Sequence, residues 1–201
     1  MLNLHGHTIL LASHSPRRRE LLTGLGFPFR SVAVEADETY PELLREGDIP
    51  LYIARAKARA YARLLPKELL LTADTIVWCE NTMLGKPTDE DDARRMLRLL
   101  SGRTHQVYTA VCMTWLGTDG QPCEDSLVDK TDVTFRELTD EEIDYYVTTY
   151  RPLDKAGSYG IQEWIGYVGV TGINGCYFNV MGLPLQPLYE MIKNWSLHYT
   201  V

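Results

Sequence analysis

Two serines and three arginines stand within seven residues near the start of the chain, at Ser13, Ser15 and Arg17–Arg19. Ser15 suits the position before a helix, and the proline after it tolerates the first helical position, so we expect a helix to begin there. A helix start carries partial positive charge, and cations crowded there lose stability unless an anion joins them. The stretch therefore predicts either a phosphate-binding corner of N–H groups, hydroxyls and guanidinium groups, or a solvated basic helix start.

A helical projection separates the three arginines. At about 100° per residue, the leucines at positions 21, 22 and 25 define the buried stripe of this helix. Arg18 projects near the middle of that stripe, Arg17 along one border and Arg19 to the opposite side. We expect Arg17 and Arg18 to lean toward the interior or a cleft. A buried guanidinium needs a partner, either a protein carboxylate or a ligand phosphate.

A lysine and an aspartate also stand in apolar surroundings. Lys57 projects into the apolar stripe of the helix expected over Pro50–Leu65, where it either snorkels to water or points into a site. Asp74 and Thr75 lie between two apolar, strand-like runs of Glu68–Cys79. An ionisable residue in that setting is either hydrogen-bonded at a strand kink or chemically employed.

The elements that must position these residues alternate along the chain. The apolar runs predict strands at Ile9–Ala12, Phe29–Val34, Glu68–Cys79, Gln106–Trp115 and Leu127–Phe135. Helices are expected from Pro16, over Pro50–Leu65, from Thr88 to Leu100, from Thr139 to about Thr149 and over Leu185–Trp195. Two of these helices open with apparent capping boxes, Thr88 with Asp91 and Thr139 with Glu142. The alternation predicts an α/β fold around a mixed sheet.

The totals limit the class of protein. A chain of 201 residues suits a single domain, and a net charge of −7 excludes a general basic surface for nucleic acid. The four cysteines are far apart and form no zinc spacing, so reduced thiols are expected. No apolar run reaches the roughly 18 residues of a membrane span, and the first residues do not resemble a signal peptide. We therefore expect a cytoplasmic protein.

Seven short blocks occur in an order typical of one family. They are Ser13-x-Ser-Pro-Arg17-Arg18, Ala73-Asp74-Thr75, Leu84-Gly-Lys86-Pro, Ser101-Gly-x-x-His105-x-Val-x-Thr109, Asp154-Lys-Ala-Gly157, Ile161-Gln162 and Gly182-Leu-Pro. With these blocks the whole chain, residues 1–201, resembles a single Maf-type nucleoside triphosphate pyrophosphatase domain. The resemblance implies a mixed, twisted sheet flanked by helices, similar to the inosine triphosphate pyrophosphatases, with an active cleft between two lobes.

The resemblance also implies a reaction. A nucleoside triphosphate and water give the monophosphate and pyrophosphate with the help of a divalent cation, Mg²⁺ or Mn²⁺. The subgroup that acts on dTTP and UTP is marked by three residues that match Arg17, Thr75 and Gln162. A sister subgroup prefers 7-methyl-GTP, and a non-catalytic nucleotide-binding regulator of cell division is the alternative from another class. A homodimer is suggested by the family alone, and neither nucleic acid nor a membrane is an expected partner.

The family's functional positions carry over residue by residue. Asp74 matches the proton acceptor, and whether it acts as a base or as a metal ligand stays open. Glu38 matches a metal-linked glutamate, although Asp37 is an alternative because no flanking motif anchors the acidic loop. The positions associated with substrate binding or catalysis match Ser13, Arg17, Arg18, Lys57, Lys86 and Gln162. Among these, Lys57 and Lys86 are expected to neutralise the leaving pyrophosphate.

Two further motifs leave a choice open. His105 suits either a general base or a structural hydrogen bond, and its place between a helix and a strand favours the structural bond. Asp154 and Lys155 form either a salt-bridged loop or part of the cleft wall. The four tryptophans are expected to pack rather than to stack on a base.

Overall fold

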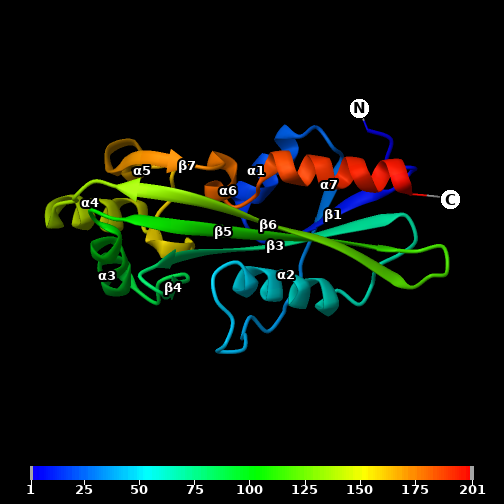
Figure 1. Cartoon of the computed structure of the whole chain (residues 1–201), viewed down its shortest axis with the longest axis horizontal. Helices are drawn as coiled ribbons and strands as arrows, with labels where there is room; N and C mark the ends of the chain where they lie inside the picture. Colours follow the sequence, from blue (N-terminus) through cyan, green and yellow to red (C-terminus); the bar gives the residue numbers. More distant parts are fainter. Residues whose placement is uncertain (1, 200–201) are drawn as a thin grey trace. The chain divides into compact units, whose positions relative to one another are not determined.

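The computed structural model describes residues 2–199 (Figure 1). The chain forms two compact units. Unit 1 comprises the chain up to Asp74, the segment Thr109–Asp129 and the chain from Gly182 onward. Unit 2 comprises Thr75–Tyr108 and Lys130–Met181. Each unit is thus assembled from segments that are distant in sequence.

Strands and helices alternate through most of the chain. The strands are β1 (Thr8–Ala12), β2 (Phe29–Val32), β3 (Glu68–Cys79), β4 (Thr82–Leu84), β5 (Thr104–Leu116), β6 (Pro122–Phe135) and β7 (Val170–Asn174). The helices are α1 (Pro16–Gly24), α2 (Asp48–Ala60), α3 (Glu90–Leu100), α4 (Asp140–Tyr150), the 3₁₀ turn η1 (Ala156–Ser158), α5 (Trp164–Gly169), α6 (Tyr177–Met181) and α7 (Leu185–His198).

Within residues 2–199 the strands form one seven-stranded sheet in the order β2-β1-β3-β5-β6-β7, with β4 paired to β3 outside this path. Strand β1 runs parallel to both β2 and β3. Strands β4 and β7 run antiparallel to β3 and β6. The sheet is therefore mixed, as the sequence predicts, and β3, β5 and β6 contribute residues to both units.

The core of unit 1 lies on both faces of β1. Ile9 to Ala12 are at most 4% exposed, because the strand is covered on both sides. Alternation sends Leu10 and Ala12 to one face, where they pack in a cluster with Ala54 and Ala58 of α2. Helices α1 and α7 lie on the other side of the sheet from α2 (Figure 1). Small alanines at the contact allow α2 to approach the sheet closely.

Helix α2 differs from the prediction at both ends. It begins at Asp48 and ends at Ala60, whereas the sequence predicts a helix over Pro50–Leu65. Tyr61 leaves helical geometry at φ −85° and ψ 84°. Tyr61 and Leu64 nevertheless pack on the same cluster as Ala54. The apolar pattern continues past Ala60 because these residues are needed for packing, so the pattern alone overestimates the length of the helix.

Unit 2 confirms one predicted capping box and corrects the other. Thr139 and Glu142 make the reciprocal bonds of a capping box at the start of α4. At the start of α3 the N-cap is Asp89 instead of Thr88, and its side chain accepts a hydrogen bond from the Asp92 N–H. Asp is as good an N-cap as Thr, so the sequence here offers two competing positions one residue apart.

The other predicted elements occur in the predicted order, and the structure adds β4, β7, α5 and α6 to them. Helix α7 extends three residues beyond the predicted end at Trp195, and β2 ends at Val32 instead of Val34. All four cysteines are free thiols. In the part of the chain that the structure describes, no helix has the length and apolar character needed to cross a membrane.

Candidate functional site

Parallel pairing brings several predicted site residues of unit 1 to one edge of the sheet. The register ends at Ala12 opposite Val32 of β2 and opposite Thr72 of β3. Ser13 follows β1 directly, the acidic loop follows β2, and Asp74 comes two residues after Thr72. In α/β sheets, ligands bind beyond the carboxyl ends of parallel strands. Unit 1 therefore gathers hydroxyl, cationic and carboxylate groups where such folds form sites.

The Lys57 ammonium lies between two carboxylates. Its Nζ is 2.8 Å from Asp74 Oδ1 and 2.9 Å from Glu38 Oε1. The side chains of Lys57 and Asp74 are 15% and 14% exposed, and that of Glu38 is 53% exposed. Asp37, the alternative in the acidic loop, instead accepts a hydrogen bond from the nearby Thr39 N–H. Glu38 and not Asp37 thus belongs to the group around Lys57.

One buried hydrogen bond explains why Lys57 reaches Asp74. The Thr72 hydroxyl donates to the Ala54 carbonyl oxygen at 2.7 Å and joins β3 to α2. Asp74 is two residues after Thr72 and lies on the same face of the strand. Lys57 is three residues after Ala54 and lies on the same side of the helix. The bond therefore sets the two elements in the register at which ammonium and carboxylate meet.

Burial makes Asp74 a stronger base than an ordinary aspartate. Loss of water contact raises the pKa of its carboxyl above the ordinary range, although the cationic groups of Lys57 and Arg18 oppose the shift. The Glu38 carboxylate adds a smaller effect in the raising direction. A carboxylate with a raised pKa accepts a proton more readily, which is the property that a general base requires.

Arg18 joins two segments of main chain beside Asp74. Its Nε donates to the Gly182 carbonyl at 2.8 Å, and one terminal nitrogen donates to the Ala73 carbonyl at 2.9 Å. The same nitrogen lies 3.5 Å from the Ser13 hydroxyl. Burial lowers the pKa of the guanidinium, but arginine stays charged at neutral pH. Arg18 therefore holds the residue before Asp74 in place and adds positive charge there.

The helix start behaves as predicted from its residues. Ser15 is the N-cap of α1, and its hydroxyl accepts a hydrogen bond from the Arg18 N–H at 3.4 Å. The Ser13 hydroxyl accepts one from the Ser15 N–H at 3.2 Å. Arg17 and Arg18 are half-buried and Arg19 is exposed, in agreement with the helical projection. No acidic residue occupies the first turn of α1, so its positive end is not neutralised from within the helix.

The donor set in unit 1 fits a cation that arrives with a phosphate ligand. Within residues 2–199 no three His, Cys, Asp or Glu side chains are gathered in a way that would hold a metal by themselves. Asp74 and Glu38 supply two carboxylates around one positive group. Mg²⁺ is commonly held by one or two carboxylates together with substrate phosphates and water. The two carboxylates therefore suit a divalent cation that the substrate helps to coordinate.

The other predicted site residues belong to unit 2. Thr75 is half-buried and follows Asp74 within the uninterrupted strand β3, which spans Glu68–Cys79 as the sequence predicts. Lys86 is exposed just after β4. The Gln162 carboxamide oxygen is buried and has no hydrogen-bond partner among the described residues. An unpaired buried acceptor is costly, so a donor from a ligand would relieve this cost.

Two open questions from the sequence have structural answers in unit 2. His105 is fully buried, with Nε2 2.8 Å from the Tyr159 hydroxyl, and burial lowers the pKa of its ring to about 4. It therefore makes the structural hydrogen bond. Lys155 pairs with Asp154 at 2.7 Å and with Glu163 at 3.1 Å, so the loop is salt-bridged.

Sequence reasoning missed the groups that position the functional side chains. Thr72 and the carbonyl oxygens of Ala73 and Gly182 belong to no charged motif. Tyr146, which bonds to Glu163 next to Gln162, reads in the sequence as one more aromatic core residue. The one available signal is the period of two that places Thr72 on the face of Asp74.

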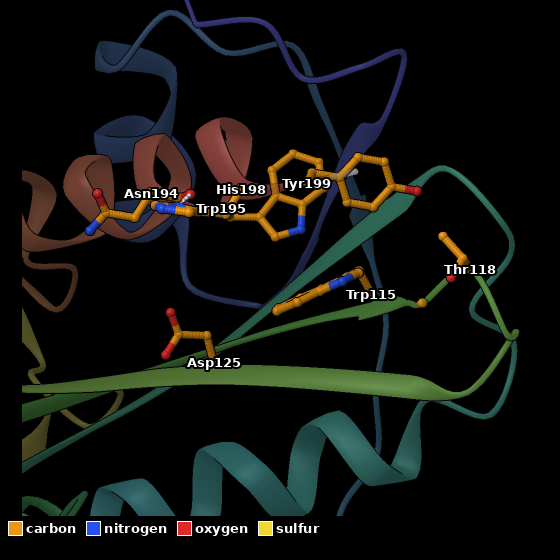
Figure 2. A pocket seen from close by; sticks show the side chains of 8 residues that line it. Trp115, Thr118, Asp125, Asn194, Trp195, His198 and Tyr199 are labelled. Atoms are coloured by element: carbon orange, nitrogen blue, oxygen red, sulfur yellow. Dashed lines mark hydrogen bonds between the residues drawn. The ribbon is translucent and has the colours of Figure 1, made fainter. Parts of the chain in front are cut away.

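A separate pocket of unit 1 lies between the β5–β6 hairpin and the end of α7 (Figure 2). Its volume is about 390 Å³, and the residues that line it are Trp115, Gly117, Thr118, Asp125, Asn194, Trp195, His198 and Tyr199. The Trp115 and Trp195 rings meet edge to face with centroids 6.2 Å apart, which is the packing role expected of them. None of the predicted site residues lines this pocket.

Comparisons with known proteins cover nearly the whole chain. The family model described as "Maf-like protein" matches residues 8–195. A relative from Phocaeicola vulgatus named dTTP/UTP pyrophosphatase is 56% identical over 95% of this chain and 97% of its own. Relatives with the same name from Bacteroides fragilis and Porphyromonas gingivalis are 54% and 50% identical, over 96% of this chain and 98% and 97% of their own.

Among solved structures, the chain is similar to a nucleoside-triphosphatase / dITP/XTP pyrophosphatase from Mycobacterium abscessus. The matched region covers 63% of this chain and 74% of that one, at 19% identity and a TM-score of 0.35. This likeness is too weak to carry an argument. The family model and the relatives above 50% identity are decisive, since each extends over nearly all of the chain. The chain belongs to the family of Maf-like proteins.

Proposed function

We propose that the protein hydrolyses nucleoside triphosphates, dTTP and UTP first among them, to the monophosphate and pyrophosphate. The observation that carries this proposal is that the Lys57 ammonium lies between the carboxylates of Asp74 and Glu38. This group lies at the edge of the sheet where β1 leads into α1. The proposal's support from outside the chain is the name dTTP/UTP pyrophosphatase that its relatives carry.

In the proposed mechanism Asp74 orients a water molecule toward the α-phosphorus and takes its proton. Its raised pKa suits that role, because a weakly basic aspartate would release rather than hold the proton. The Ser13 hydroxyl and the guanidinium of Arg17, both beside the positive start of α1, bind phosphate oxygens. Lys57 and Lys86 neutralise charge that develops on the departing pyrophosphate. Arg18 keeps Ala73, and with it Asp74, in position.

Asp74 and Glu38 would hold the divalent cation, Mg²⁺ or Mn²⁺, that the family resemblance implies. When bound, such a cation supplies positive charge to phosphate oxygens and assists the ionisation of water. The ammonium of Lys57 already lies between the two carboxylates, so it balances their charge before substrate binds. Asp74 thereby serves as base, as metal ligand or as both.

Base selection is assigned to Arg17, Thr75 and Gln162, the three residues that match the subgroup acting on dTTP and UTP. The unpaired carboxamide oxygen of Gln162 supports this assignment, because it can accept a hydrogen bond from an N–H group of the base. Thymine and uracil both carry such a group at N3.

A substrate panel tests the proposed function. The protein is incubated with Mg²⁺, with Mn²⁺ or with a chelator, and with dTTP, UTP, dCTP, GTP or 7-methyl-GTP, and pyrophosphate and orthophosphate are measured separately. We expect pyrophosphate from dTTP and UTP, and none with the chelator. Asp74→Asn should lower the rate by about 10² to 10⁴-fold, whereas Asp119→Asn in the exposed hairpin loop should leave it unchanged.

The other outcomes separate the alternatives. Preference for 7-methyl-GTP would keep the reaction and change the substrate. Tight nucleotide binding without any product would favour a regulator that binds without catalysis. Release of orthophosphate in place of pyrophosphate would refute attack at the α-phosphorus.

A further inference from the structure

A buried polar network surrounds the Glu163 carboxylate in unit 2. The Tyr146 hydroxyl donates a hydrogen bond to Glu163 Oε2, and the Lys155 ammonium lies 3.1 Å from Glu163 Oε1. Tyr146 is fully buried, and Lys155 is 7% exposed. Buried polar groups are retained at a cost unless their partners are complete, so this network fixes its members firmly. Its members are not among the residues assigned to substrate or catalysis above.

The network holds both ends of the turn that carries Gln162. At one end the Gly160 N–H donates to the Tyr146 hydroxyl at 3.0 Å, and at the other end the Glu163 carboxylate accepts from the same hydroxyl. The Glu163 N–H closes the turn by donating to the Gly160 carbonyl at 2.9 Å. One phenol therefore clamps the four-residue turn, and Ile161 anchors it at 4% exposure.

The Glu163 carboxylate lies on the same side of Gly160 as the Gln162 carboxamide nitrogen. A Cβ added to Gly160 would lie 3.1 Å from Glu163 Oε2 and 3.2 Å from Gln162 Nε2, so the carboxylate and the amide nitrogen border the same space. A carboxylate attracts the amide NH₂ and repels the amide oxygen. A carboxylate at this place favours the orientation that has the NH₂ group nearer to it, and the buried carboxamide oxygen has no partner among the described residues. Gln162 as a whole is only half-buried, so a ligand can reach its side chain.

The protonation of the network suits this role. Burial raises the pKa of the Tyr146 hydroxyl, and its bond to Glu163 raises it further. The phenol therefore stays protonated and remains a donor at neutral pH. The Lys155 ammonium offsets the negative charge of Glu163, which allows a carboxylate to remain beside the buried phenol.

We propose that Tyr146, Lys155 and Glu163 are positioning residues that present the Gln162 carboxamide oxygen as an acceptor for the imide N–H of a thymine or uracil base. The inference rests on the proposed function and deepens it. Cytosine carries a lone pair at N3 in place of this N–H. Its N3 and the Gln162 carboxamide oxygen are therefore both acceptors and cannot form the hydrogen bond. A site built around one hydrogen bond rejects the analogue that lacks it, because a buried polar group is then left unpaired.

The test compares the two pyrimidines in variants of neighbouring tyrosines. Tyr146→Phe removes the hydroxyl that clamps the turn, and Tyr145→Phe on the same helix is the matched control, since Tyr145 is 48% exposed. For each protein kcat and KM are measured with dTTP and with dCTP, and thermal unfolding is recorded. We expect Tyr146→Phe to lower the ratio of kcat/KM for dTTP over dCTP by about tenfold, and Tyr145→Phe to keep the wild-type ratio.

A second variant decides the matter if Tyr146→Phe does not fold. Glu163→Gln keeps the size of the side chain and removes the charge that orients the carboxamide, and it should lower the same ratio. If the network is merely structural, the variants should lower kcat/KM for dTTP and for dCTP in proportion and leave the ratio unchanged. That result would overturn the inference. If the wild-type protein releases no pyrophosphate from dTTP, the proposed function fails instead, and the inference with it.

Discussion

Lys57 has two carboxylate neighbours, and the balance of charge around it sets the basicity of Asp74. Burial raises the pKa of Asp74, and the ammonium of Lys57 is the strongest of the groups that oppose this shift. Two carboxylates close together destabilise each other unless a cation lies between them. Lys57 therefore acts on the free enzyme as well as on the departing pyrophosphate of the proposed reaction.

Replacing Lys57 should move the acid limb of the rate profile. In Lys57→Met the opposing ammonium is gone, so the pKa of Asp74 rises further and the base is protonated over a wider range of low pH. We expect the acid limb of kcat/KM for dTTP to shift to higher pH, and the plateau to fall by about tenfold or more. Lys193→Met is the matched control, because Lys193 pairs with Glu190 on the surface of α7. An acid limb that stays in place in Lys57→Met would remove Lys57 from the control of Asp74.

Much of the residue-scale picture follows from the sequence, and the exceptions have a common cause. Angular arithmetic is enough to place Arg17 and Arg18 inward and Arg19 outward, because a helix repeats regularly. The same arithmetic places Lys57 in an apolar stripe. It does not give Asp74 as the partner of Lys57, because that contact joins a helix to a strand through tertiary packing.

At the scale of elements, the bond from Thr72 to Ala54 ties β3 to α2 and determines where Asp74 and Lys57 meet. The capping box at Thr139 stabilises α4 in unit 2 without touching any predicted site residue. Each side chain contributes one hydroxyl to a hydrogen bond that can be removed without a change of charge. Comparing variants of Thr72 and Thr139 therefore separates a loss of stability from a change in the geometry around Asp74.

We expect two threonine variants to lose similar stability and to differ in activity. Thr72→Val and Thr139→Ala each remove one such hydroxyl and should each lower the free energy of unfolding by about 1 kcal/mol. Only Thr72→Val should lower kcat for dTTP, because it alone loosens the register between Lys57 and Asp74. Denaturant unfolding and steady-state kinetics on both proteins check this. Equal kcat in the two variants would show that the register bond has no catalytic consequence.

The sequence predicts the existence of elements better than their ends. The capping box at Thr139 was predictable because the two partners are three residues apart. The start of α3 was not, since Thr88 and Asp89 are adjacent residues that can both serve as caps, and the structure uses Asp89. The end of α2 was predicted beyond Ala60 because Tyr61 and Leu64 continue its apolar pattern outside the helix.

At the scale of the molecule, the class of fold and the family could be predicted, and the resemblance implies two lobes, but the segments that form each unit could not be predicted. Alternating helices and strands suffice for a mixed α/β sheet. Assignment of Thr109–Asp129 to unit 1 depends on which distant segments pack together, and no local pattern records that. The net charge of −7 likewise gives no hint of the cationic groups gathered near Asp74.

The position of the attacked phosphorus is the central claim, and labelled water tests it most directly. The protein is incubated with dTTP and Mg²⁺ in water enriched in ¹⁸O, and both products are examined by mass spectrometry. The proposed mechanism predicts one ¹⁸O atom in dTMP and none in pyrophosphate, because water attacks the α-phosphorus and pyrophosphate leaves. Label in pyrophosphate, with unlabelled dTMP, would place the attack on the β-phosphorus and contradict the account.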